Sequence, residues 1–181
     1  SAAKQYGLEV NDEVDERYDP EKATIAACKY LKKGYAKYND WGTEAASYNA
    51  GMARISKELD RQLRDTSFDL YLNEETSRYV FRIIAMKIVL QNPRAFGFSL
   101  TANQLYQPIK YKVVEVNGAV ESWSEWAKKY DVSYLSLKEL NPWIRSHSLT
   151  NKMGKTYKVK VPLVDELYRS KRKNVVYNEN W

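Results

Sequence analysis

The hydrophobic pattern of this 181-residue chain changes after Pro108. Before that point apolar residues recur at helical spacing, whereas Tyr111–Val116 and Tyr157–Pro162 beyond it alternate as strands do. This change predicts an α+β protein in which a mainly helical part precedes a small mixed module. The expected domains are a helical part at 1–107, a module at 108–163 and a basic tail at 164–181.

Four helices are expected in the first part. Asp19 can cap a helix that begins at Pro20 and runs to about Tyr38. Others are expected at about 41–51, 55–64 and 75–91. The helix at 75–91 is apolar on nearly every side, which predicts the central helix of an all-α domain.

The module is expected to follow the order strand, helix, helix, strand. Asn117 opens a turn after the first strand, and Ser122 can cap a short helix at about 123–130. A second short helix is expected around Leu135–Leu140. Two helices between two strands in about fifty residues predict one compact unit.

Charge is distributed unevenly along the chain. Residues 1–107 hold 15 Lys and Arg against 15 Asp and Glu, whereas residues 108–181 hold 14 against 8. A basic C-terminal part suits an anionic partner, although a solvated basic face explains it equally well. The Lys residues are dispersed over alternating strands rather than aligned in a stripe, so we predict no nucleic-acid partner. No apolar run reaches transmembrane length.

The single cysteine and the single histidine exclude several kinds of site. Cys28 shares helical spacing with Ile25 and Leu31, which predicts a small core residue and no disulfide within the chain. His147 lies in a polar loop, where a solvated side chain is expected. A catalytic triad or a multi-histidine zinc site would each depend on this one residue. We therefore predict no metal site and no cofactor.

The stretch from Ser47 to Gly51 closes the second predicted helix. Gly51 can end that helix with a positive φ, and Tyr48 and Asn49 present polar tips. The run Ser-Tyr-Asn-Ala-Gly resembles the Ala-Tyr-Asn-Ala-Gly signature of the lytic transglycosylases, lysozyme-like enzymes that cut peptidoglycan strands. Ser47 stands where that family usually has alanine.

Four further stretches resemble motifs of the same family, in the same order. They are Lys4–Val10, Val14–Pro20, Asn39–Trp41 and Glu75–Val80. Their agreement in order across residues 1–107 argues against coincidence. The resemblance implies that this part is a partial, mainly helical lysozyme-like domain.

The module resembles a LysM domain, a class that binds polymers containing N-acetylglucosamine. The resemblance rests on Tyr111–Val113, Leu137–Asn141 and Gly154–Pro162. The two loops that form the LysM sugar site differ here, because 117–123 lacks the usual Gly-Asp-Thr-Leu and the loop after Asn141 is long. The tryptophans that would stack on sugar faces are Trp123, Trp126 and Trp143, and a buried core position is the equal alternative for each.

The resemblance also implies a mechanism. In these enzymes one glutamic acid protonates the glycosidic oxygen of the bond between N-acetylmuramic acid and N-acetylglucosamine, then draws a proton from the 6-hydroxyl and leaves a 1,6-anhydro product. Such an acid needs a raised pKa and an enclosed apolar site. By resemblance Tyr48 supports it and Asn49 shapes the same corner. Glu75 and Tyr79 share one helix face and would line the cleft.

No glutamate of this chain stands in the Glu-Ser-x-Phe context of the family's general acid. The resemblance places that acid upstream of Ser1, and Glu44 is expected to face outward. We therefore expect a lytic transglycosylase whose 181 residues lack the catalytic residue and are inactive alone. The alternative is a non-catalytic glycan-binding protein.

The expected partner is the glycan strands of peptidoglycan. That substrate implies the periplasm or the outer membrane of a Gram-negative bacterium. Outer-membrane association would act through an N-terminal segment missing from this sequence.

Overall fold

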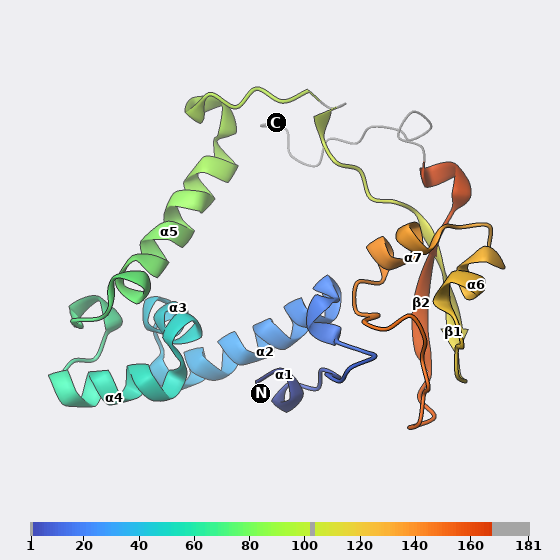
Figure 1. Ribbon diagram of the computed structural model, residues 1–181. Helices are drawn as coiled ribbons and strands as arrows, with labels where there is room; N and C mark the ends of the chain where they lie inside the picture. Colours follow the sequence, from blue (N-terminus) through green and yellow to red (C-terminus); the bar gives the residue numbers. More distant parts are fainter. Residues whose placement is uncertain (1, 102–103, 168–181) are drawn as a thin grey trace. The chain divides into compact units, whose positions relative to one another are not determined.

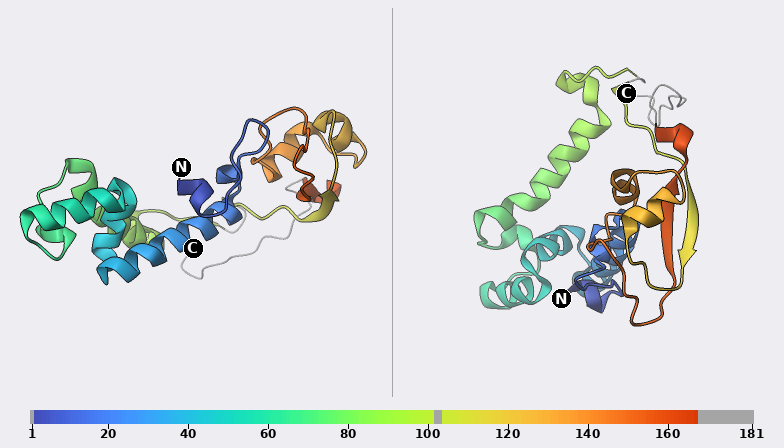
Figure 2. Two further views of the ribbon diagram at one scale, coloured as in Figure 1. Left: turned by 90° about the horizontal axis from the view of Figure 1, so that it is seen from below. Right: turned by 45° about the vertical axis from the view of Figure 1, so that its right-hand side comes forward.

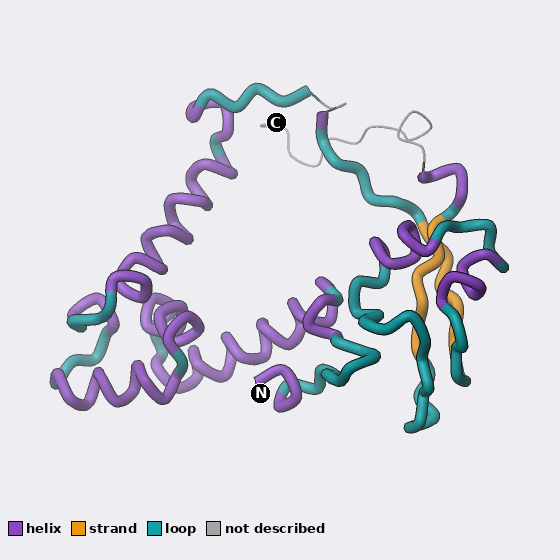
Figure 3. Tube along the Cα trace, viewed as in Figure 1, coloured by secondary structure: helices purple, strands orange, loops and turns teal. Residues whose placement is uncertain are grey.

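The structure is a computed structural model that describes residues 2–101 and 104–167. Its described residues form two compact units, one made of 2–24 and 104–167 and the other of 25–101. Helices predominate, and the described strands form one two-stranded sheet (Figure 3). The fold class is α+β, as predicted. The domain limits expected after 107 and 163 stay predictions, because family domains and compact units need not coincide.

The helices of the first hundred residues follow the predicted order (Figure 1). They are α2 at Pro20–Tyr38, α3 at Trp41–Ala50, α4 at Met52–Gln62 and α5 at Glu74–Gln91, with short 3-10 turns η2 at Ser67–Asp69 and η3 at Pro93–Phe96. Helix α2 begins in one unit and continues into the other. Helix α4 begins three residues earlier than the pattern indicated.

Capping residues fix where these helices begin and end. The Asp19 carboxylate accepts a hydrogen bond from the Glu21 amide at 3.0 Å, and Asp40 accepts one from the Thr43 amide at 2.7 Å. Gly51 follows α3 with φ at 93°, a value that only glycine adopts without strain. These contacts confirm Asp19 as the cap of α2 and Gly51 as the end of α3.

Helix α5 is not the buried central helix that its apolar sequence predicted. It packs against α3 and η3, and Thr76 is its only buried residue among those described. Phe81 and Met86 are each 59% exposed. The prediction was wrong because a helix that is apolar all round needs neighbours on every side, and in the described part of the unit its neighbours leave most of its side chains exposed.

The other unit contains the predicted module. Strands β1 at Tyr111–Val116 and β2 at Tyr157–Pro162 pair antiparallel, with Tyr111 opposite Pro162 and Val116 opposite Tyr157. Between them lie α6 at Trp123–Lys128 and α7 at Tyr134–Leu140, which contact each other (Figure 2). Ser122 caps α6 by accepting the Glu125 amide, as predicted.

The core of this unit includes a residue from far away in the sequence. Trp123, Leu137 and Val159 are each at most 1% exposed and form one cluster with Val14. Val14 belongs to the N-terminal segment, which contains α1 at Ala2–Gln5 and the 3-10 turn η1 at Glu16–Tyr18. This segment runs beside the loop between α7 and β2 (Figures 1 and 2).

Other predictions can now be compared with the structure. Cys28 is exposed, so its assignment to a core was wrong; α2 buries Ala26 and Gly34 instead. His147 is exposed, as predicted. The basic tail lies outside the described residues, apart from a 3-10 turn, η5, at Val164–Leu167. In the described part of the chain, no helix has the length and apolar character that crossing a bilayer requires.

Candidate functional site

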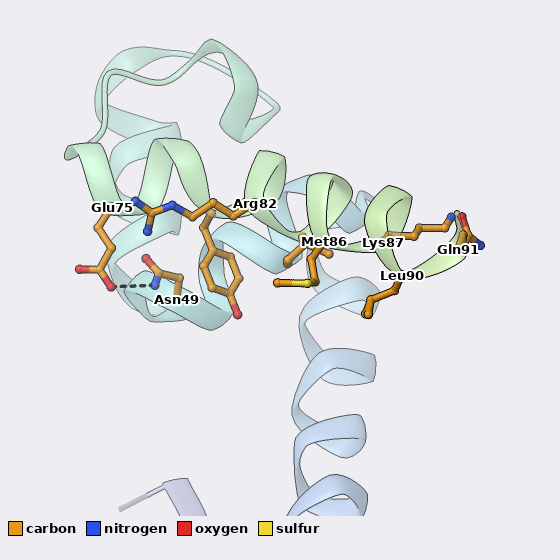
Figure 4. A pocket seen from close by; sticks show the side chains of 9 residues that line it. Asn49, Glu75, Arg82, Met86, Lys87, Leu90 and Gln91 are labelled. Carbon is orange, nitrogen blue, oxygen red and sulfur yellow. Dashed lines mark hydrogen bonds between the residues drawn. The ribbon is translucent and has the colours of Figure 1, made fainter. Parts of the chain in front are cut away.

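An open groove of about 670 Å³ runs along one face of α5. It lies wholly within the 25–101 unit (Figure 4). Its lining residues recur every three or four positions along the helix, which places them on one face. They are Glu75, Tyr79, Arg82, Ile83, Met86, Lys87, Leu90 and Gln91, joined by Asn49 from the end of α3.

Hydrogen bonds join the two helices at one end of this groove. The Asn49 amide nitrogen donates to the Glu75 carboxylate at 3.3 Å, a contact drawn in Figure 4. The Thr76 hydroxyl donates to the Asn49 amide oxygen at 2.9 Å. Asn49 therefore uses both ends of its amide group to hold the last turn of α3 against the first turn of α5.

The groove changes in character along its length. Asn49 and Glu75 make one end polar. Toward the other end Ile83, Met86 and Leu90 form an apolar stretch, which Lys87 and Gln91 flank. The polar groups suit hydroxyl and amide groups of a ligand, and the apolar stretch suits its hydrophobic faces. Glu75 itself is exposed.

The structure brings together three of the four cleft residues expected from the sequence. Asn49, Glu75 and Tyr79 all line the groove, but Tyr48 does not. Tyr48 is 45% exposed, and its ring meets the Tyr30 ring edge-on, with centroids 5.6 Å apart. Its expected support of a general acid stays a prediction.

Glu44 was expected to face outward, and that expectation was wrong. Its side chain is fully buried, one carboxylate oxygen accepts the Ser47 hydroxyl at 2.7 Å, and the other has no hydrogen-bond partner. Burial raises the pKa of the Glu44 carboxyl, and the hydrogen bond from Ser47 offsets only part of that rise.

Gly34 of α2 provides the room for this buried carboxyl. A Cβ atom built at Gly34 would lie 1.5 Å from a carboxylate oxygen of Glu44. The sequence did contain a signal for the burial of Glu44. Thr43, Ala46 and Ser47 are small residues whose spacing marks the buried face of α3 next to Glu44. Glu44 does not line the groove.

The three tryptophans expected to bind sugar have different environments. Trp123 is 1% exposed and Trp143 is 4% exposed, so neither ring offers a face for stacking. The platform role was therefore wrong for these two, because a module of this size needs its largest side chains in its core. Trp126 is partly exposed and contacts the rings of Trp123 and Tyr130, and its expected role stays a prediction.

The described residues contain no group of three or more His, Cys, Asp or Glu side chains that could hold a metal ion. The groove has one carboxylate, Glu75, and two cations, Arg82 and Lys87. Its chemistry is therefore that of a binding surface for a polar, partly apolar ligand.

Two family profiles match the chain, in the order in which the folded parts occur. Residues 1–68 match the transglycosylase SLT domain, and residues 112–165 match the soluble lytic transglycosylase C-terminal LysM-like domain. The chain thus carries an SLT-type domain followed by a LysM-like domain, and it is homologous to lytic transglycosylases.

Two curated relatives show a more specific similarity. The chain is 26% identical over 154 residues to the membrane-bound lytic murein transglycosylase D of Escherichia coli strain K12. The protein of that name from Escherichia coli O6:H1 matches equally well. These matches cover 82% of this chain and 33% of each relative. The chain therefore spans about a third of the length of the curated relatives that it matches.

Proposed function

We propose that this protein is a peptidoglycan lytic transglycosylase that cleaves the β-1,4 bond between N-acetylmuramic acid and N-acetylglucosamine and leaves a 1,6-anhydro product. The SLT-type match and the similarity to proteins named murein transglycosylases support this proposal. The observation that carries it is the groove, where Asn49 of the signature stretch and Glu75 of α5 are hydrogen-bonded at its polar end.

The lining of the groove suits a glycan strand. Sugar rings have apolar faces and hydroxyl edges, and N-acetyl groups add an amide. Ile83 and Met86 offer apolar surface, and Asn49 and Glu75 offer hydrogen-bonding groups. Muropeptide carboxylates would meet Arg82 and Lys87. We assign Tyr79 and Glu75 to substrate orientation rather than to proton transfer.

The described groove supplies no general acid. Glu75 is exposed, whereas an acid of this class needs an enclosed, apolar site to stay protonated near neutral pH. Glu44 has a raised pKa, but it is buried away from the groove lining. We therefore expect this chain alone to release no 1,6-anhydromuropeptides from purified peptidoglycan; their appearance would refute this assignment.

Binding by the groove can be tested with soluble, uncrosslinked peptidoglycan strands and isothermal calorimetry. We expect Glu75→Ala to weaken binding by about tenfold, the value of one or two lost hydrogen bonds. Glu74→Ala is the matched control, because Glu74 is exposed on the same helix, pairs with Arg78 at 2.6 Å and does not line the groove. Equal affinities for the two variants would refute the proposed groove.

The alternative is a non-catalytic glycan-binding protein. The absence of an enclosed acid from the described groove lining favours it. Both functions predict that the strands bind, but only the transglycosylase predicts 1,6-anhydro ends from a form of the protein that carries a Glu-Ser-x-Phe segment. Mass spectrometry of digests distinguishes the two.

We propose a location in the cell envelope, periplasmic or associated with the outer membrane. The support is the proposed substrate and the relatives' printed name, "membrane-bound". Fractionation of the native host, with detection of the chain in membrane and periplasmic fractions, tests this; recovery in the cytoplasmic fraction would refute it.

A further inference from the structure

The loop between α7 and β2, residues 141–156, already has an occupant in this structure. The N-terminal segment 9–18 pairs with it along the backbone. The Asp15 amide donates to the Trp143 carbonyl at 2.8 Å, and the Arg145 amide donates to the Glu13 carbonyl at 2.8 Å. These two bonds form a short antiparallel ladder around the pair Val14 and Ile144.

Side chains reinforce this ladder on both sides. The Glu13 carboxylate accepts the amide and the hydroxyl of Thr150, each at 3.0 Å. The Glu9 carboxylate accepts from the Lys155 ammonium at 2.9 Å and from the Tyr157 hydroxyl at 3.1 Å. Burial would raise the pKa of Glu9, but these hydrogen bonds and the Lys155 charge outweigh it and lower that pKa.

The segment also completes the hydrophobic core. Val14 is 1% exposed and lies in the same buried cluster as Ile144 and Leu149. Beyond the ladder, the Arg145 guanidinium lies over the Tyr18 ring, 4.3 Å from its centroid. A segment held by main-chain hydrogen bonds, an ion pair and a core side chain is a structural part of the unit.

We propose that the LysM-like domain uses its 141–157 region as an intramolecular docking surface, whose occupant is segment 9–18 of the same chain and not a glycan. The domain then fixes the position of the segment that leads into α2. This inference is independent of the proposed groove, because it concerns residues of the other compact unit.

If the LysM-like domain holds segment 9–18, the segment should open together with that domain and not with the helical unit. Amides that open together in one cooperative unit lose exchange protection together. Ile55 and Val159 are both fully buried, one in α4 and one in β2, so their alanine variants form a matched pair. We expect Val159→Ala to lower the protection of the Asp15 and Arg145 amides by about tenfold or more.

Ile55→Ala should lower the protection of α3 and α4 while leaving those two amides unchanged within about twofold. Hydrogen exchange read by NMR on the full chain measures both variants. If the protection of Asp15 follows Ile55→Ala and not Val159→Ala, the segment belongs to the helical unit and the proposal fails.

A disulfide lock tests the occupant directly, because its readout is the formation of a covalent bond rather than a change in stability. Val14 and Ile144 form a non-hydrogen-bonded antiparallel pair, whose Cα separation of about 4.5 Å suits a disulfide. In a Cys28→Ser background, V14C/I144C should oxidise fully. V14C/V113C should form no intramolecular disulfide, because Val14 is buried in the core whereas Val113 of β1 is 52% exposed and lies outside that core. Failure of the first pair to oxidise would overturn the proposal.

The locked protein then separates the two possible occupants. N-acetylglucosamine hexamer is titrated into the oxidised and the reduced V14C/I144C chain. Equal affinity, or no binding by either form, supports a segment that never leaves its place. Binding by the reduced form that the lock abolishes would show that glycan displaces the segment, and would overturn the proposal.

Discussion

Replacing Glu44 with methionine should stabilise the 25–101 unit. The carboxyl is fully buried and one of its oxygens has no partner, which costs about 1–3 kcal/mol even when the group is neutral. Methionine has a similar length and no unpaired polar atom. The Ser47 hydroxyl keeps an acceptor, because it also donates to the main-chain carbonyl of residue 44 at 2.9 Å.

The stabilisation should increase with pH. The pKa of Glu44 is raised above 4.5 in the folded chain, so between pH 4.5 and that raised value the folded form retains a proton that the unfolded form has lost. The contribution of Glu44 to the free energy of unfolding of the parent therefore falls as pH rises through this window and is constant above it. Each unit by which the pKa is raised contributes about 1.4 kcal/mol.

The free energy of unfolding is measured at pH 4.5 and pH 8 by urea titration, with hydrogen exchange of the α3 amides as the readout. We expect the free energy of unfolding of Glu44→Met to exceed that of the parent by about 1–3 kcal/mol at the lower pH and by more at the higher pH. Glu74→Met, at an exposed position, should change stability by less than about 0.5 kcal/mol at both. A Glu44→Met protein that is less stable than the parent, or a difference that does not grow with pH, would refute the reasoning.

Three more predictions concern packing and ionisation. Gly34→Ala should destabilise the parent, because the added Cβ atom would lie 1.5 Å from a carboxylate oxygen of Glu44. In a Glu44→Ala background the same substitution should stabilise α2 by about 0.5–1 kcal/mol. A double-mutant cycle measured by urea unfolding tests this, and the absence of coupling between the two sites would contradict it. Val14→Ala should cost about 2 kcal/mol in Trp-monitored unfolding, whereas Val113→Ala should cost far less, and equal losses would contradict the docking of Val14. Burial, and after it the nearby Glu9 carboxylate, raise the pKa of Tyr157 to about 12. Glu9→Gln should therefore lower the pKa of Tyr157, as measured by titration of carbon-13-labelled tyrosine. An unchanged pKa would contradict the pairing of Glu9 with Tyr157.

The helices and strands were predictable because their signals are local. Asp19 followed by Pro20, and Ser122 ahead of α6, mark helix starts within one turn of chain. Strand alternation likewise located β1 and β2 to the residue. Such signals depend on neighbours in sequence, so they do not require knowledge of the tertiary fold.

Burial was less predictable because it depends on what packs against each face. Cys28 and Glu44 were both placed on the wrong side of their helices. For Glu44 the deciding residue is Gly34, ten positions earlier and on another helix, whose missing side chain leaves space for a carboxyl. Periodicity alone does not reveal such a pairwise fit.

The candidate groove was partly predictable for the same reason. Glu75 and Tyr79 share a helix face by spacing alone, and Asn49 joined them through the family signature. Tyr48 is adjacent to Asn49 but points elsewhere, because successive residues of a helix lie about 100° apart. A sequence signature names both residues without saying which one lines the groove.

The position of Val14 shows that sequence families and packing units can divide a chain differently. By sequence it lies in the SLT-type match at 1–68, whereas by packing it lies in the core of the LysM-like domain. A cut at the predicted limit after residue 107 would therefore remove a fully buried side chain from that core and break the ladder at Trp143. It would also leave the carboxylates of Glu9 and Glu13 without the donors that they pair with here. The LysM-like domain is thus complete only with a segment that the sequence assigns to its neighbour.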